Sequence, residues 1–270
     1  MTNACKISVI VPCFNHGEFL SETVASVTGA KRDDLELIVV DDGSTDERTR
    51  EEVDALCRQG IRIIRQENKG VAAARNTAIL ASQGQYIFPL DADDHLRPGW
   101  IDQGIRILDS DPQVGVVYGD EEFFGTQTGR WHTGPFDLDR MLHFNYMSVS
   151  ALYRRSVWEQ NGGYDGTMPV QGFEDWDFWL GAFERGWHFV YLPEVFIDYR
   201  RANESMLTHA LKFNAETEEF IAKKHGPLYR RAWLPYLQER RSLRLAFRHL
   251  ARLVVARSKM EFSRRLSSRL

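Results

Sequence analysis

Three aspartates, Asp91, Asp93 and Asp94, follow directly after the apolar run YIFPL of residues 86–90. Aspartate is depleted in strands and a buried, unpaired carboxylate is costly, so this concentration of negative charge requires a positive partner. Mg²⁺ or Mn²⁺ fits that need, because these ions prefer carboxylate oxygens, use one or two of them and complete their shell with substrate phosphates. Asp91 and Asp93, at positions i and i+2 of a turning strand end, are the predicted metal ligands.

A second acidic pair, Asp41 and Asp42, ends the apolar run of residues 35–40. In a parallel α/β sheet, the carboxyl ends of the strands meet at one edge, and ligands bind there. We therefore expect both acidic clusters to face one cleft. A single aspartate at a strand end can instead be a helix cap or a turn residue, and for Asp46 the two interpretations have equal weight.

The first hundred residues have the pattern of a scaffold that brings strand ends together. Four apolar runs alternate with three segments of helical character, and this alternation predicts an α/β domain with a mostly parallel sheet. The predicted strands span residues 6–15, 35–42, 61–67 and 85–94, and the predicted helices span 17–29, 46–60 and 70–84. Later segments are expected to form strands at 114–124 and 188–200, a strand that passes into a helix at 146–163, a helix at 173–186, and helices from about residue 210 with a break near Gly226-Pro227.

Two common phosphate-binding motifs are missing from the sequence. The first strand–helix turn, PCFNHGEF, holds one glycine where a dinucleotide site needs GxGxxG, and GxxxxGK[ST] does not occur. The composition, 43% hydrophobic and 27% charged, is that of an ordinary globular protein. Three scattered cysteines indicate reduced thiols. With no secretory signal and no apolar run of about eighteen residues, a cytoplasmic location is predicted.

Four blocks of the sequence resemble, in order and in spacing, the signature blocks of glycosyltransferase family 2. They are SVIVPCFNHGEFLSETVASV, LELIVVDDGSTDER, NKGVAAARNTAILASQGQYIFPLDADD and GFEDWDFWLGAFERG, and the similarity covers residues 6–205. The resemblance implies a GT-A fold, which is a Rossmann-like, mostly parallel sheet flanked by helices. It also implies a nucleotide-diphosphate sugar as donor, usually Mg²⁺ or Mn²⁺ as cofactor, and inversion of the anomeric centre.

The resemblance also implies a role for individual residues. Asp93 would be the principal metal ligand, and Asp91 would lie near the ribose or in the metal shell. The residues that would border or bind the nucleotide are Pro12 and Asn15 in the first turn, Asp41 or Asp42 at the second strand end, and Asn68, Arg75 and Asn76 in the third block.

Asp175 matches the general base of the family, and Glu174 would support it or touch the acceptor. An acidic neighbour raises the pKa of a carboxyl group, which suits a base that works near neutral pH. The alternative is that both acids only favour a helix N-terminus through its dipole, and the two interpretations are compatible. The spacing of Trp176, Trp179 and Phe183 predicts core packing, with Phe173 or Trp176 as an alternative platform for a sugar.

The sequence departs from the family pattern at Ala202, where a histidine is expected after IDYR. If that histidine contributes to metal or diphosphate binding in relatives, Arg200, Arg201 or His209 are candidates to replace it, since guanidinium pairs well with phosphate. The remaining histidines that we considered show no ligand spacing and are expected to be ordinary; they are His16, His95, His132, His143 and His188.

Positive charge is concentrated near the C-terminus. Residues 230–270 hold twelve Arg or Lys and two Glu, whereas the whole chain has a net charge of -4. On a helical wheel of residues 240–259, apolar and arginine side chains separate onto two faces. Such a helix either lies on an anionic membrane or packs on the catalytic domain, and both remain open. We expect a catalytic domain at 1–208 and a basic helical extension at 209–270.

The leading hypothesis is an inverting, metal-dependent glycosyltransferase that moves a sugar from a nucleotide-diphosphate donor to a glycan or lipid-linked acceptor, in bacterial surface-polysaccharide synthesis and at the inner face of the cytoplasmic membrane. One alternative is a nucleotidyltransferase, for which a Gly-rich loop is expected after the first strand. The other is a sugar-nucleotide-binding protein without catalysis, against which Asp93 and Asp175 argue. Nucleic acid is not an expected partner, because residues 1–229 are acidic.

Overall fold

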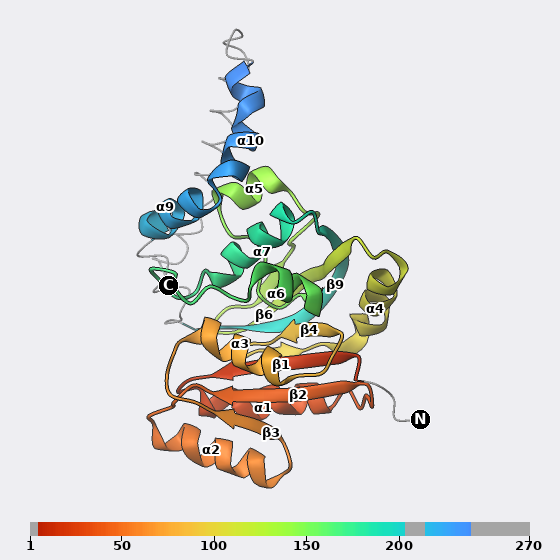
Figure 1. Cartoon of the computed structure of the whole chain (residues 1–270). Coiled ribbons are helices and arrows are strands. Elements are labelled where there is room, and N and C mark those ends of the chain that lie inside the picture. Colours follow the sequence, from red (N-terminus) through yellow and green to blue (C-terminus); the bar gives the residue numbers. More distant parts are fainter. Residues whose placement is uncertain (1–4, 203–213, 239–270) are drawn as a thin grey trace. The chain divides into compact units, whose positions relative to one another are not determined.

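The computed structural model describes residues 5–202 and 214–238 (Figure 1). Within these residues, one nine-stranded sheet runs in the order β3-β2-β1-β4-β8-β6-β9-β5, and β7 pairs with β6 outside this path. Helices flank the sheet. The predicted α/β fold is confirmed. The sheet is parallel through its first four strands and mixed beyond them.

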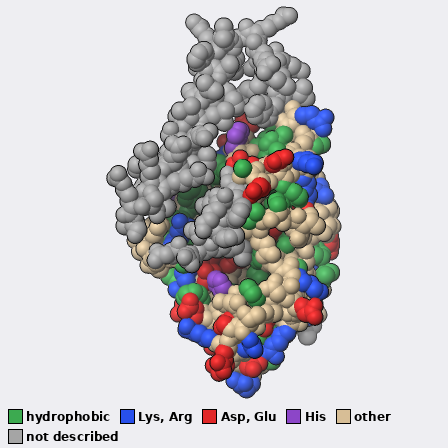
Figure 2. Space-filling model, turned by 90° about the vertical axis from the view of Figure 1, so that its left-hand side faces the viewer, with side chains coloured by type: hydrophobic (Ala, Val, Ile, Leu, Met, Phe, Trp, Pro, Cys, Tyr) green, Lys and Arg blue, Asp and Glu red, His purple; other side chains and the backbone are tan. Residues whose placement is uncertain are grey.

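The parallel half contains the predicted alternation of strands and helices. Its strands are β1 (Ile7–Cys13), β2 (Leu35–Asp41), β3 (Arg62–Arg65) and β4 (Tyr86–Pro89), and its helices are α1 (Gly17–Thr28), α2 (Glu47–Arg58) and α3 (Val71–Ala81). β1 lies between β2 and β4 and pairs in parallel with both. The carboxyl ends of these strands lie at the left-hand edge in Figure 1, which faces the viewer in Figure 2.

Local sequence accounts for these elements. All seven residues of β1 are buried, which is why the run reads as continuously apolar instead of alternating. α2 begins at a true cap, because the Asp46 carboxylate accepts a hydrogen bond of 2.8 Å from the backbone N–H of Thr49. The structure therefore selects the capping interpretation for Asp46.

The second half of the sheet contains longer and antiparallel strands. β6 (Val114–Gly125) pairs in parallel with β9 (His188–Arg201) and antiparallel with β7 (Gly129–Trp131) and β8 (Leu152–Arg154), while β5 (His95–Leu96) pairs antiparallel with β9. The helices of this half are α4 (Ile101–Ser110), α5 (Leu138–His143), α6 (Arg155–Asn161) and α7 (Glu174–Glu184), and a short 3₁₀ turn, η1, spans Pro98–Trp100. The antiparallel β8 joins the two halves, since it pairs with β4 on one side and β6 on the other.

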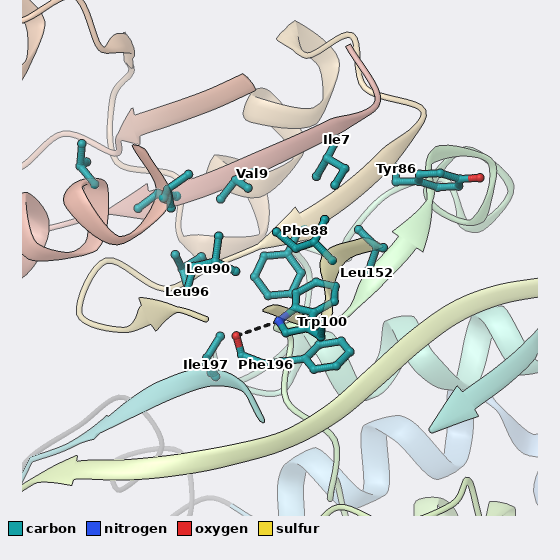
Figure 3. Packing of buried hydrophobic residues seen from close by; sticks show 14 of the residues in the cluster. Ile7, Val9, Tyr86, Phe88, Leu90, Leu96, Trp100, Leu152, Phe196 and Ile197 are labelled. Carbon is teal, nitrogen blue, oxygen red and sulfur yellow. Dashed lines mark hydrogen bonds between the residues drawn. The ribbon is translucent and has the colours of Figure 1, made fainter. Parts of the chain in front are cut away.

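A buried aromatic stack anchors the segment that follows the acidic tip of β4 (Figure 3). The rings of Trp100 and Phe196 are parallel, with centroids 3.7 Å apart, and the Trp100 indole N–H donates a 3.1 Å hydrogen bond to the Phe196 carbonyl. Phe88 of β4 packs against the other side, 5.1 Å from Trp100. The stack joins β4, η1 and β9, so it fixes the chain on both sides of the three aspartates.

Two compact units divide the chain, residues 1–224 and 225–270. Helix α9 (Asn214–Lys224) belongs to the first unit and α10 (Gly226–Gln238) to the second, and the helical path breaks at His225, next to the predicted break. The domain boundary predicted between residues 208 and 209 and the amphipathic segment 240–259 lie outside the described residues, so both stay predictions. Among the described helices, none combines the length and apolar character that a membrane span requires.

Candidate active site

The two acidic strand ends meet at one edge of the sheet, as expected. Cys13, the last residue of β1, pairs with Asp41, the last residue of β2, and β1 pairs on its other side with β4. Burial raises the pKa of the Cys13 thiol to about 12, and the nearby carboxylates of Asp41, Asp46 and Asp93 add to this rise. Carboxylates from both strand ends therefore act on the same point, at the carboxyl ends of β1, β2 and β4.

Both carboxylate oxygens of Asp42 accept hydrogen bonds from other groups of the protein. Its side chain is buried, and its two oxygens accept hydrogen bonds from Gln66 Nε2 (2.7 Å), the Lys69 backbone N–H (3.0 Å) and the Gly70 backbone N–H (2.8 Å). Asp41 is also buried and accepts a 3.0 Å bond from the Ser44 backbone N–H. Asp42 thus holds the loop that leads into α3, and its contact with a nucleotide stays a prediction.

Asn15 connects the first turn to the loop after β2 through hydrogen bonds. Its backbone is left-handed, with φ of 56°, and its Oδ1 accepts hydrogen bonds from the backbone N–H groups of Thr45 (2.8 Å) and Asp46 (3.2 Å). Pro12 is buried within β1, whereas Asn68 is exposed. Of the predicted nucleotide-binding residues of this region, Pro12 is therefore buried, whereas Asn15 and Asn68 are exposed.

Arg75 provides a positive partner inside the protein. It projects from α3, is only 3% exposed, donates a 2.7 Å hydrogen bond to Asp91 Oδ1 and forms a second ion pair with Glu174. Burial alone would lower the pKa of the guanidinium, but the two carboxylates outweigh it and hold that pKa above its ordinary value. A permanently charged arginine thus joins the predicted metal side of the site to the predicted base side.

The side chain of Asn76, the next residue, forms hydrogen bonds within the protein. Its side-chain oxygen accepts hydrogen bonds from Trp158 Nε1 (2.8 Å) and the Tyr164 backbone N–H (2.9 Å), and its side-chain nitrogen donates to the Tyr164 carbonyl (2.8 Å). These bonds hold the chain after α6 against α3. A direct contact of Asn76 with nucleotide stays a prediction.

The three aspartates after β4 differ in exposure. Asp94 is buried, and its Oδ1 accepts a 2.8 Å bond from the Arg200 backbone N–H. The side chains of Asp91 and Asp93 are 38% and 24% exposed, so these two carboxylates are the ones that reach solvent. Burial, and after it the charge of Asp91, raises the pKa of Asp93. The two predicted ligands are therefore the accessible pair, and they repel each other.

This pair fits a cation whose remaining ligands come from a substrate. In the described parts of the chain, no group of three or more His, Cys, Asp and Glu side chains is placed to hold a metal ion. Mg²⁺ commonly takes one or two carboxylates together with substrate phosphates, so two accessible carboxylates are a sufficient protein contribution. A bound cation would also relieve the repulsion between Asp91 and Asp93.

Two basic side chains lie at this acidic tip. His16, which shows no ligand spacing in the sequence, places Nδ1 4.0 Å from Asp93 Oδ2 and is 49% exposed. Arg200 Nε donates a 2.9 Å bond to the Asp93 carbonyl, while its guanidinium lies over the rings of Phe19 and Phe124. The spacing of the histidines in the sequence does not reveal His16 as a site residue. Its place in the first turn, at the same sheet edge as the acids, could have indicated it.

The other two candidates to replace the missing histidine differ from Arg200. The Arg201 guanidinium lies over the Phe123 ring, 5.0 Å from its centroid. His209 lies outside the described residues.

Glu174 and Asp175 begin α7 and are both buried. Burial, and after it the charge of Glu174, raises the pKa of Asp175 to about 7, while the positive charge of Arg75 opposes the rise. The Trp176 backbone N–H donates a 2.9 Å hydrogen bond to Asp175 Oδ1, and this bond and the nearby Asn145 side chain also oppose the rise of the pKa. A carboxyl group with this pKa can exchange a proton near neutral pH, as a general base must.

Of the three aromatic side chains whose spacing predicts core packing, Trp176 and Trp179 are buried, whereas Phe183 is half-buried and stacks on Phe136. Trp176 and Trp179 are at most 1% exposed, and the Trp176 indole N–H donates to the Met141 carbonyl at 2.6 Å. Phe173 is 4% exposed. Neither Phe173 nor Trp176 presents a ring to solvent, so the alternative of a sugar platform at these two residues has no support in the structure.

A cleft lies beside this acid pair, between the start of α3 and the loop that leads into α7. Lys69, Gly70, Gln171 and Glu174 contribute to its lining. The cleft therefore begins where the Asp42-bonded loop ends, and it reaches the acid that pairs with Arg75.

Proteins with a similar sequence are glycosyltransferases. Residues 8–171 match the model of the family described as Glycosyl transferase family 2. The uncharacterized glycosyltransferase EpsJ of Bacillus subtilis is 38% identical over 236 residues, which cover 81% of this chain and 67% of EpsJ. Glycosyltransferase GlyG of Streptococcus pneumoniae is 38% identical over 125 residues, and the match covers 44% of this chain but only 41% of GlyG.

The fold is also that of a solved structure. A crystal structure of S. aureus TarS in complex with UDP-GlcNAc superimposes with a TM-score of 0.61 at 20% identity, and the match covers 75% of this chain and 60% of that chain. At this identity the likeness concerns the fold, and it confirms the expected GT-A architecture. Because the family model spans more than half of the sequence and contains both acidic strand ends, the chain belongs to glycosyltransferase family 2.

Proposed function

We propose that this protein transfers a sugar from a nucleoside-diphosphate sugar to an acceptor hydroxyl, with inversion at the anomeric carbon. The observation that carries the proposal is the position of Arg75, which pairs with Asp91 on one side and Glu174 on the other. One guanidinium thus joins the carboxylates suited to a metal and a diphosphate to the acid pair suited to proton transfer. Inverting transfer needs these two functions close together, on opposite sides of the reacting carbon.

Asp175 would take the proton of the acceptor hydroxyl as the acceptor oxygen forms its bond to the anomeric carbon. The bond from that carbon to the diphosphate oxygen breaks in the same displacement, and the nucleoside diphosphate leaves with the electron pair. Asp91 and Asp93 would hold Mg²⁺ or Mn²⁺, which supplies positive charge to the leaving diphosphate. Glu174 raises the pKa of Asp175, and Arg75 keeps Glu174 and Asp91 in place.

The donor class to test first comes from a structure of similar fold. The TarS structure of similar fold was determined with UDP-GlcNAc, so UDP-sugars are the first donors to test. For the acceptor we retain a glycan or a lipid-linked saccharide of a bacterial surface polysaccharide. Contact with an anionic membrane would depend on residues 240–259, which the structure does not describe.

The test is turnover of a donor panel. UDP-, GDP- and dTDP-sugars are incubated with the protein and Mn²⁺, with and without chelator, and released nucleoside diphosphate is measured. We expect one donor class to be turned over, loss of turnover with chelator, and in Asp175→Asn a fall of about 10²-fold or more with donor binding retained. Binding of a donor without any turnover, with diverse acceptors present, would contradict the proposal and favour a binding protein.

A matched control comes from the same helix. Glu184 ends α7, about 15 Å along the helix from its first residue. Glu184→Gln removes one acidic charge as Asp175→Asn does, and it should retain the turnover of the wild type. If both variants lose activity equally, the loss does not report a base.

A further inference from the structure

One tryptophan differs from the others in its surroundings. Among the tryptophans whose side chains the structure describes, Trp131 alone is a large exposed hydrophobic residue, at 37% exposure. It ends β7, the short strand that folds back on β6. An exposed indole needs an explanation, because large apolar rings are usually buried and their exposure often marks a binding surface.

The strand register places Trp131 beside the active site. Trp131 pairs directly with Glu121 of β6 in the antiparallel ladder. Residues directly opposite each other have their side chains on the same face, with Cβ atoms about 5 Å apart. Glu121 is buried, and the charges of Arg201 and Asp91 act on its pKa, so it lies near the predicted metal ligand Asp91. Trp131 therefore lies on the same face, at the open end of the hairpin.

The indole is held in place by the segment after α5. Its N–H donates a 3.2 Å hydrogen bond to the Tyr146 carbonyl. The Arg140 guanidinium lies 5.9 Å from the Trp131 ring and 4.0 Å from the Tyr146 ring, and it donates a 2.9 Å bond to the Thr133 carbonyl. A ring fixed in this way loses little conformational freedom when a ligand packs on it.

The same segment reaches the predicted base. The side chain of Asn145, the neighbour of Tyr146, lies close enough to Asp175 to lower its pKa, and the side chain of Ser148 does the same for Glu121. Residues 145–148 therefore lie near the base, the buried acid of β6 and the exposed indole within four consecutive positions. A molecule that presents a hydroxyl to Asp175 along this segment would extend toward Trp131.

We propose that Trp131 is the stacking platform of an acceptor subsite, and that it packs against a pyranose ring of the acceptor saccharide. This inference rests on the proposed function and names the chemical class of the acceptor. A pyranose has an apolar C–H face that matches a flat, rigid aromatic surface, and Glu121, the strand partner of Trp131, adds a polar group on the same face. Sites of this kind combine an apolar wall with a few placed polar groups.

The test separates acceptor binding from donor chemistry. A panel of p-nitrophenyl glucosides, galactosides and N-acetylglucosaminides serves as acceptors, and hydrolysis of the donor by water serves as a readout that needs no acceptor. In Trp131→Ala we expect the acceptor KM to rise at least about tenfold, while the donor KM and donor hydrolysis stay within about twofold. Trp131→Phe keeps a ring and loses only the indole hydrogen bond, so its acceptor KM should stay within about threefold.

Leu80→Ala is the control, because Leu80 is an exposed apolar residue of α3 that belongs to neither site. It should match the wild type in every constant. An unchanged acceptor KM in Trp131→Ala, or a parallel fall of donor hydrolysis and transfer, would overturn the inference. If the wild type neither hydrolyses nor transfers any donor, the proposed function itself fails. The measurement of donor hydrolysis therefore distinguishes a failure of the proposed function from a failure of the inference about Trp131.

Discussion

Replacing Glu174 with glutamine should shift the acid limb of the pH–rate profile to lower pH. The pKa of Asp175 is about 7, against an ordinary value of 3.8, and the charge of Glu174 is the largest cause of this rise after burial. Glutamine keeps the shape of the side chain and removes its charge. Asp175 should then lose its proton more easily and act as a base at lower pH.

The size of the effect follows from these values. The rise of the Asp175 pKa from 3.8 to about 7 corresponds to roughly 4 kcal/mol between the two protonation states, and one neighbouring charge commonly changes a pKa by about one. At pH 6, a base of pKa 7 is deprotonated in roughly a tenth of the molecules, and a base of pKa 6 in about half. The ratio of the rate at pH 6 to the rate on the plateau should therefore rise about fivefold in Glu174→Gln.

The assay is release of nucleoside diphosphate between pH 5 and pH 9, with each variant normalised to its own plateau. Normalisation separates the shift from any loss of total activity, which we expect because Arg75 loses one of its two partners. Glu184→Gln, at the other end of α7, should leave the limb in place. The reasoning is refuted if the limb of Glu174→Gln coincides with that of the wild type or moves to higher pH.

Three further predictions concern stability, measured by urea unfolding. Because the pKa of Asp175 is raised to about 7, the wild type loses stability as the pH rises from about 4 through 7. Asp175→Asn should therefore be more stable than the wild type at pH 8, by up to ~4 kcal/mol, but not at pH 4. An equal difference in stability at the two pH values would refute this prediction. Arg75→Met should lower the free energy of unfolding by about 3–5 kcal/mol, since Asp91 and Glu174 lose their partner, and a loss under ~1 kcal/mol would contradict the bridge. Trp100→Ala should cost about 3–5 kcal/mol by opening the stack on β9, and an unchanged urea midpoint would speak against that packing.

The sequence predicts those features of the site that depend on strand ends. Asp91 and Asp93 follow an apolar run, and parallel strands bring their carboxyl ends together, so the meeting of both acidic clusters could be expected without a structure. Asp175 could be placed by its match to a family block. Its pKa could be predicted in direction, because the adjacent Glu174 is visible in the sequence, whereas burial, the larger cause, is not.

Contacts between distant segments could not be predicted in this way. The partners of Arg75 lie 16 and 99 positions away, and nothing in an alanine-rich helix indicates which side chain will join them. The position of His16 beside Asp93 depends on the conformation of the first turn. Trp131 acquires its significance only from the register of β7 on β6, since the sequence does not show which residue it will face.

The measurement that tests the central claim most directly is Mn²⁺ binding in the presence of UDP, followed by electron paramagnetic resonance. The claim is that the acidic tip after β4 holds a cation together with a nucleoside diphosphate, while the base lies apart from it. Wild type should bind one Mn²⁺, Asp93→Asn should bind it at least about tenfold more weakly, and Asp175→Asn should stay within about twofold of wild type. Equal Mn²⁺ affinity in Asp93→Asn and wild type, or an equal loss in both variants, would contradict the claim.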